Sequence, residues 1–276
     1  MKSTKKFEGR LICTDLDGTL LRDDKTISRE NIEAIEYFKS EGGYFTFVTG
    51  RMPSFVSKMY NAINPNAPFG CINGGGIFDH RTMKYVWTQS LDRSALEMVA
   101  AVDKEVAKMG IQVNTFDTIY FNKDNETMVH FRQETGLPNL SCHYNDVPGE
   151  LAKVVFGSDE EEDIQRLISV LNSHPLTSKF GYIRSEKRLY EILPKGISKG
   201  SVLMKLAEIL SVSPERTIAV GDYNNDVAML KAAGIGIAVK NASPEALAAA
   251  DMVTVSNEEH AIARIIYDID SGKIKI

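Results

Sequence analysis

Short apolar runs alternate with amphipathic segments in the first quarter of the chain. The run at 11–14 predicts a buried strand, and Ser28 predicts the cap of a helix that continues to Lys39, with Ile32, Ile35 and Phe38 on one face. Gly42 and Gly43 end that helix. The pattern then predicts a strand at 44–49, a helix from Pro53 to Ile63 and a third strand at 69–72.

The same alternation returns at the end of the chain. Apolar spacing predicts helices over 198–210, 226–233, 244–250 and from 258, and strands over 217–220, 235–239 and 253–255. Strands that alternate with helices in this way are typical of an α/β fold with a doubly wound, mostly parallel, Rossmann-like sheet.

The middle of the chain has a different pattern. It predicts helices over 91–109 and 159–171, and short strands near 120, at 153–156, at 179–183 and at 189–192. Runs of strands with two helices favour a separate α+β unit. We therefore predict a core made of residues 1–86 and 193–276, with a cap domain of residues 87–192 inserted into it. The acidic run 159–163 marks a helix N-terminus, where the helix dipole favours negative charge.

Two aspartates follow the first predicted strand. Asp15 and Asp17 are one residue apart, so their side chains lie on one side of an extended backbone, and Gly18 allows a sharp turn after them. Ligands of open α/β sheets bind at this edge. Such a pair can hold a divalent cation or attack phosphorus, but Asp-Gly is also a common turn. A calcium loop does not fit, because its first ligand would fall on Cys13.

Three further polar segments occupy similar positions. Thr49-Gly50-Arg51 ends the second strand, where a hydroxyl and backbone N–H groups can bind a phosphate oxygen. Lys199 begins a helix, where a solvated lysine is the ordinary alternative. Asp222 to Asp226 follow another strand, and their carboxylates suit a hard cation such as Mg²⁺, although Asn224 or Asn225 as a helix cap would explain the segment equally.

Composition narrows the classes of function. The net charge of −5 argues against non-specific binding to nucleic acid or to an anionic membrane. No apolar run is long enough to span a membrane, and the basic start of the chain lacks the apolar stretch of a signal peptide. The 3 cysteines lie far apart, and Cys13 is expected in the core. We therefore expect a cytoplasmic protein.

Taken together and in this order, the four motifs resemble those of the haloacid dehalogenase (HAD) superfamily, and most closely its Cof-type (type IIB) phosphatases. The matching residues are Asp15-x-Asp17-Gly18-Thr19, Thr49-Gly50-Arg51, Lys199-Gly200 and Gly221-Asp222-x-x-Asn225-Asp226. The segment 72–77 is similar to the Asn-Gly-rich element of that family. The resemblance covers essentially the whole chain and implies a HAD core with an inserted cap that governs substrate specificity.

The resemblance also implies roles for single residues. Asp15 would be the nucleophile, and Asp17 the general acid and then the base. Mg²⁺ would be bound by Asp15, by the backbone carbonyl of Asp17 and by Asp222. The phosphoryl oxygens would be bound by Leu16, Thr49, Gly50, Lys199 and Asn225, and Asp226 would orient Lys199.

The sequence leaves more than one role open for Arg51 and more than one function open for the protein. Arg51 can contact the substrate or pair with a core carboxylate, and we favour the pairing. Arg132, His143 and Arg184 are polar cap residues that we expect at the surface. The predicted function is hydrolysis of a small phosphorylated metabolite, for which the family favours a sugar phosphate. A sugar phosphomutase and a non-catalytic regulator that binds a phosphorylated metabolite are the alternatives, and the sequence does not give the oligomeric state.

Overall fold

The computed structural model describes residues 5–276. The first four residues, which belong to the predicted core segment 1–86 and its basic start, lie outside the described residues. The chain forms two compact units, and the boundaries between them lie between residues 88 and 89 and between residues 197 and 198. The first unit joins the N-terminal segment to residues 198–276, and the second unit is the stretch Gln89–Ile197 between them.

The first unit is built on a five-stranded sheet in which every pair of neighbouring strands is parallel. The strand order is β13-β12-β11-β1-β2, and the bounds are β1 Leu11–Thr14, β2 Tyr44–Phe47, β11 Thr217–Gly221, β12 Ile235–Ala238 and β13 Met252–Val253. The predicted α/β class with a mostly parallel sheet is confirmed. Because β1 pairs with β11, the strand ends that carry Asp15 and Asp222 are neighbours.

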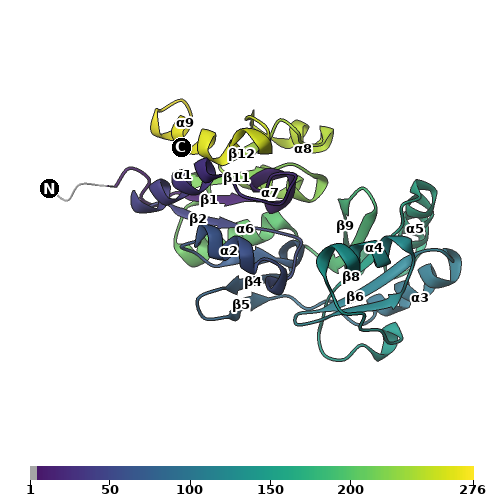
Figure 1. Cartoon of the computed structure of the whole chain (residues 1–276). Helices are drawn as coiled ribbons and strands as arrows, with labels where there is room; N and C mark the ends of the chain where they lie inside the picture. Colours follow the sequence, from purple (N-terminus) through teal and green to yellow (C-terminus); the bar gives the residue numbers. More distant parts are fainter. Residues whose placement is uncertain (1–4) are drawn as a thin grey trace. The chain divides into compact units, whose positions relative to one another are not determined.

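Helices cover both faces of this sheet. Figure 1 shows α1 and α9 on one face and α6 on the other. The bounds are α1 Arg29–Ser40, α2 Ser57–Ile63, α6 Lys199–Leu210, α7 Val227–Ala232, α8 Pro244–Ala249 and α9 Ala261–Asp270. Ser28 caps α1 as predicted, since its side chain accepts a hydrogen bond from the N–H of Asn31. The predicted helix 53–63 is interrupted at Val56, where a short 3₁₀ turn meets α2.

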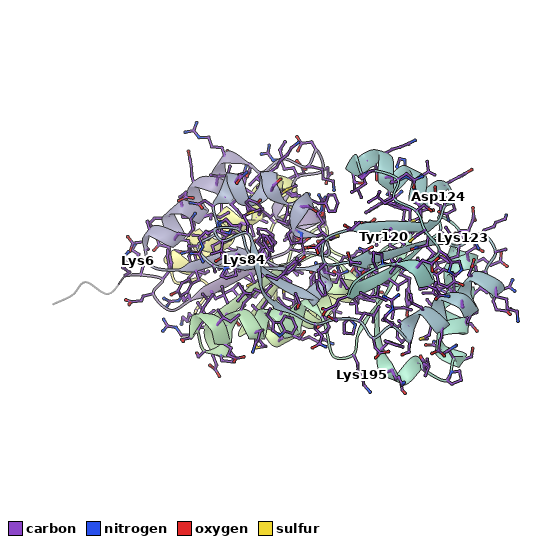
Figure 2. The ribbon with its side chains drawn as sticks, turned by 90° about the horizontal axis from the view of Figure 1, so that it is seen from below. Lys6, Lys84, Tyr120, Lys123, Asp124 and Lys195 are labelled. Carbon is purple, nitrogen blue, oxygen red and sulfur yellow. The ribbon has the colours of Figure 1, made fainter. Side chains whose placement is uncertain are left out.

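The third predicted strand does not join the main sheet as a full member. It is β3 Phe69–Cys71, and it belongs to a separate antiparallel sheet with β4 Gly76–Asp79 and β5 Lys84–Thr88. A single parallel bridge between Val48 and Gly70 connects β3 to the end of β2. The cause is the tight turn at 72–74, which reverses the chain into β4 before β3 can lengthen. Figure 2 labels Lys84, the first residue of β5.

The second unit is an α+β unit. Its antiparallel sheet has the order β7-β6-β8-β10-β9, with β6 Gly110–Thr115, β7 Ile119–Lys123, β8 Leu151–Gly157, β9 Phe180–Glu186 and β10 Leu189–Pro194. Its helices are α3 Ala95–Glu105, α4 Glu126–Thr135 and α5 Glu161–Ser173. Figure 2 labels Tyr120 and Lys123 of β7, and Asp124 directly after that strand.

Two elements of this unit, β6 and α4, were not predicted from the sequence. The predicted helix 91–109 is present as α3 but ends at Glu105, and residues 106–109 lead into β6. Helix α4 was not predicted, because only Thr127 and Met128 of its residues are buried and its apolar periodicity is weak. Its start is fixed by Asn125, whose side chain accepts from the N–H of Met128.

The described residues contain no helix long and apolar enough to cross a membrane. Buried apolar side chains form internal clusters in both units. In the first unit, Leu11 and Cys13 of β1 pack with Val202, Leu203 and Leu206 of α6. Cys13 is a buried core residue, as predicted. This packing holds the start of α6, and therefore Lys199, beside the sheet.

Helices α6 and α7 approach each other closely at Gly200. A Cβ added at Gly200 would lie 2.3 Å from the backbone oxygen of Ala228 in α7. An alanine in place of a helical glycine ordinarily adds up to about 1 kcal/mol of stability. Here we expect Gly200→Ala to lower the free energy of unfolding by about 1–3 kcal/mol, because the methyl group overpacks the contact.

Denaturation in urea, followed by circular dichroism, measures this change. Ile209→Ala is the control, since Ile209 is exposed on the same helix and its loss should change stability little. A higher unfolding midpoint for Gly200→Ala would contradict the close approach of the two helices.

Candidate functional site

The site lies at the carboxyl edge of the parallel sheet, where β1 and β11 end. Asp15 follows β1 in an extended conformation, and its N–H donates to the carbonyl of Val220 at 2.8 Å. Gly18 then turns the chain with φ of 73°. A Cβ at Gly18 would lie 2.5 Å from Oδ2 of Asp222, so a glycine is required for the two strand ends to approach.

Lys199 connects the two strand ends through its ammonium group. Its Nζ lies 2.7 Å from Oδ1 of Asp15 and 2.7 Å from Oδ1 of Asp226. The side chain is 1% exposed, so these ion pairs are formed in the protein interior. Ser198 caps α6 by accepting from the N–H of Ser201, which fixes the position of the first helical turn that carries Lys199.

Asp226 has both of its carboxylate oxygens in use. Oδ1 accepts from Lys199, and Oδ2 accepts from the backbone N–H groups of Asp222 at 3.0 Å and Tyr223 at 3.1 Å. Asp226 therefore holds the lysine and shapes the turn after β11. The position predicted for Asp226, beside Lys199, is the one that the structure gives it.

Asp15, Asp222 and Asp226 form an acidic cluster in which one oxygen of each carboxylate lies within 4.8 Å of the others. Since Asp226 is fully hydrogen-bonded, Asp15 and Asp222 are the members able to take a cation. One oxygen of Asp15 accepts from Lys199, and Oδ1 of Asp222 accepts from the hydroxyl of Thr19 at 2.7 Å. The second oxygen of each is given no hydrogen bond by the described residues.

The charges in this cluster do not balance. Burial, followed by the negative charge of Asp226, raises the pKa of Asp15 well above its ordinary value, and the same two causes raise the pKa of Asp222 to about 7. The pKa of Lys199 is raised by Asp15 and Asp226, although burial alone would lower it. Three carboxylates share one ammonium, and a hard divalent cation with oxygen ligands fits the remaining negative charge.

Asp17 points toward a different set of partners. Its Oδ2 accepts from Nε of Arg51 at 2.8 Å, and its Oδ1 accepts from Nη2 of Arg51 at 2.6 Å and from Nζ of Lys25 at 3.0 Å. Burial opposes ionisation, but Arg51 outweighs it and lowers the pKa of Asp17. The predicted pairing of Arg51 with a core carboxylate is confirmed. Lys25 was not singled out from the sequence.

The predicted phosphate-binding residues surround the same strand ends. Leu16 follows Asp15 directly and begins the buried turn Leu16–Leu20. Thr49 is buried, and its hydroxyl accepts from the N–H of Arg51 at 3.2 Å. Asn225 is connected to the Thr49–Arg51 turn through Asn73, which accepts from Nδ2 of Asn225 at 3.1 Å and whose Oδ1 would lie 2.9 Å from a Cβ at Gly50.

Asn73 was placed in an Asn-Gly-rich element by the sequence analysis but was given no role. Its side chain is 2% exposed and lies between two of the predicted phosphate-binding segments. The sequence signal that could have found it is the segment Asn73-Gly74-Gly75-Gly76 directly after an apolar strand. In the second unit, Arg132 and Arg184 form ion pairs with Asp124 and Glu161.

Comparisons with known proteins agree with this arrangement. A family model described as haloacid dehalogenase-like hydrolase matches residues 12–266. The chain is 28% identical to the 5-amino-6-(5-phospho-D-ribitylamino)uracil phosphatase YitU of Bacillus subtilis, over 93% of this chain and 96% of that protein.

Comparison with solved structures finds the same fold. A haloacid dehalogenase-like hydrolase from Bacteroides thetaiotaomicron is 26% identical with a TM-score of 0.78, over 94% of this chain and 99% of that one. A sugar phosphatase of HAD subclass IIB has a TM-score of 0.83 at 22% identity, over 96% and 100% of the two chains, which is a likeness of fold.

The raised pKa of Asp222 predicts a pH dependence of stability in the metal-free protein. Between about pH 4 and about pH 7 the folded protein binds more protons at this carboxyl than the unfolded chain does, so its contribution to stability falls as pH rises. Asp222→Asn removes this ionisation. We therefore expect the variant to melt above wild type in excess chelator, by more at about pH 8 than at about pH 5.

Differential scanning fluorimetry at the two pH values gives the comparison. Asp117→Asn, at an exposed position in the other unit, is the control for loss of one negative charge. Equal shifts for Asp222→Asn at both pH values would show that Asp222 carries no uncompensated charge in the folded protein.

Proposed function

This chain belongs to the haloacid dehalogenase-like hydrolase family, and on that basis we propose that it is a Mg²⁺-dependent phosphatase of a small phosphorylated metabolite. The family and enzyme class predicted from the four motifs are thereby confirmed. The observation that carries the proposal is the buried contact of Lys199 with Asp15 and Asp226 beside Asp222. It supports a catalytic role because the carboxylate that we propose as nucleophile lies beside an ammonium group and beside the carboxylate that we propose as metal ligand.

Asp15, Asp222 and the backbone carbonyl of Asp17 would hold the Mg²⁺ ion. When bound, the ion supplies positive charge that offsets the carboxylates and the substrate phosphate. The two acidic side chains support this assignment through their raised pKa values, since both favour an added cation. Asp226 is left out because Lys199 and two N–H groups already occupy its oxygens.

Asp15 attacks the phosphorus atom in the first step. The bond from phosphorus to the leaving oxygen breaks, and an aspartyl-phosphate forms on Asp15. Asp17 gives its proton to the leaving oxygen, so it must be protonated in the substrate complex even though Arg51 lowers its pKa in the metal-free protein. In the second step Asp17 takes a proton from water, whose oxygen attacks the phosphorus and releases inorganic phosphate and the free carboxylate. Asp17 has Arg51 as its bidentate partner, which fixes the direction of its carboxyl group.

The phosphoryl oxygens would be held by the backbone of Leu16, by Thr49 and Gly50, and by Lys199 and Asn225. Backbone N–H groups, a hydroxyl, an ammonium and a carboxamide are donors that stabilise charge on phosphoryl oxygen in the transition state. Asp226 would act through Lys199 by keeping its ammonium group charged and directed toward Asp15. The contacts of Lys199 with both carboxylates support this division.

We favour a sugar phosphate or a related phosphorylated polyol as substrate. The relative YitU is named for a substrate with a phosphorylated ribityl chain, which supports this class. We propose the role of a substrate-specificity cap for the unit Gln89–Ile197.

Release of inorganic phosphate tests the proposal. With Mg²⁺ present, wild type should hydrolyse at least one member of a panel of sugar phosphates, nucleotides and phosphorylated cofactors. Asp15→Asn should lose essentially all of this activity, because the amide is not a nucleophile and forms no aspartyl-phosphate. Turnover of Asp15→Asn near the wild-type rate would contradict the assignment of Asp15 as the nucleophile.

The same assay tests the metal. Excess chelator should abolish turnover by wild type, and added Mg²⁺ should restore it. Asp117→Asn, which alters an exposed carboxylate in the other unit, should respond as wild type does. Substantial hydrolysis in excess chelator would count against the metal site, and isomerised product without phosphate release would favour a mutase.

A further inference from the structure

The chain adopts a left-handed backbone at three successive residues directly after β3. The φ values are 56° at Ile72, 52° at Asn73 and 103° at Gly74. Glycine and asparagine adopt this region readily, but a β-branched residue such as Ile72 is rarely found there. Such a conformation persists only where the surroundings enforce it.

Contacts on two sides of the turn enforce this conformation. The N–H of Ile72 donates to the carbonyl of Arg51 at 3.0 Å, and the N–H of Asn73 donates to the carbonyl of Thr49 at 3.0 Å. At Gly74, a Cβ would lie 2.4 Å from the carbonyl oxygen of Ser198, the residue that caps α6. The turn is thus fixed against the Thr49–Arg51 segment and against the start of the Lys199 helix.

The side chain of Asn73 extends these contacts to the segment after β11. Its Oδ1 accepts from Nδ2 of Asn225 at 3.1 Å, and both side chains are buried. Oδ1 of Asn225 is buried with no hydrogen-bond partner among the described residues. The hydrogen bond to Asn73 is therefore the side-chain contact that orients the carboxamide of Asn225.

We propose that Asn73 is a positioning residue of the phosphate site, an inference that rests on the function proposed above. It fixes the orientation of the Asn225 carboxamide and its distance from the Thr49–Arg51 turn, and so it determines the affinity of the site for phosphate. The position requires a residue that accepts a left-handed backbone and carries a hydrogen-bonding side chain. Asparagine meets both requirements.

The test is the variant Asn73→Gly, which keeps the left-handed backbone and removes only the carboxamide. The probe is inorganic phosphate as a product inhibitor, measured with Mg²⁺ and beside KM and kcat. We expect the inhibition constant for phosphate and KM each to rise about 10-fold, because a hydrogen bond to a charged group is lost or misdirected. Asn64→Gly is the matched control, since Asn64 is also left-handed but is exposed and ends α2.

A double-mutant cycle with Asn225→Ala separates positioning from a general loss of structure. If Asn73 acts through Asn225, the double variant should bind phosphate no more weakly than Asn225→Ala alone. If the two substitutions instead weaken phosphate binding by independent factors that multiply in the double variant, the proposal is overturned. An unchanged inhibition constant in Asn73→Gly would also overturn it, even if its melting temperature falls, because that result is the one a purely structural residue gives.

A second variant keeps the test decisive if Asn73→Gly does not fold. Asn73→Asp keeps the shape and the acceptor oxygen but adds negative charge beside the proposed phosphate site, so the inhibition constant should rise further than about 10-fold. An unchanged value would place Asn73 away from bound phosphate and overturn the proposal. Wild type that neither turns over nor binds phosphate would instead contradict the proposed function.

Discussion

One buried ammonium group stabilises the carboxyl edge of the parallel sheet, where the candidate site lies. Lys199 pairs with Asp15 after β1 and with Asp226 after β11, and it is almost completely removed from solvent. Removing one partner of a buried ion pair is costly because the other charge is left uncompensated. The three groups therefore constrain one another, while Asp222 beside them remains short of positive charge. This shortage of positive charge in the metal-free protein is the basis of the cation binding proposed above.

The topology of the sheet makes this contact possible. Strands β1 and β11 are separated by about two hundred residues of sequence, yet they are parallel neighbours with Thr14 opposite Val220. Parallel strands end at the same edge, so their following residues meet there. The packing of α6 against β1 places Lys199 at that edge, and the absence of a side chain at Gly18 and Gly200 permits the close approaches.

Much of this was predictable from local sequence. The strand before Asp15, the cap at Ser28 and the alternation near the C-terminus each reflect residue patterns that act over a few positions. The pairing of β3 with β4 was not predictable, because it depends on the left-handed turn at Ile72. That turn is enforced by hydrogen bonds to the carbonyls of Arg51 and Thr49, which belong to the segment after the preceding strand β2. Helix α4 was missed because it buries little apolar surface. The Asn-Gly-rich segment marks Asn73 in the sequence, but its contact with Asn225 joins distant parts of the chain and could not be predicted from that local pattern.

The most direct test of the account asks which residue carries the phosphoryl group. Wild type is mixed with its best substrate and Mg²⁺, quenched during turnover and treated with borohydride, which reduces an aspartyl-phosphate to homoserine. Peptide mass spectrometry then locates the modified residue. The account predicts homoserine at position 15 and at no other aspartate, with none in Asp15→Asn. A modified residue elsewhere, or none in an enzyme that is turning over, would contradict it.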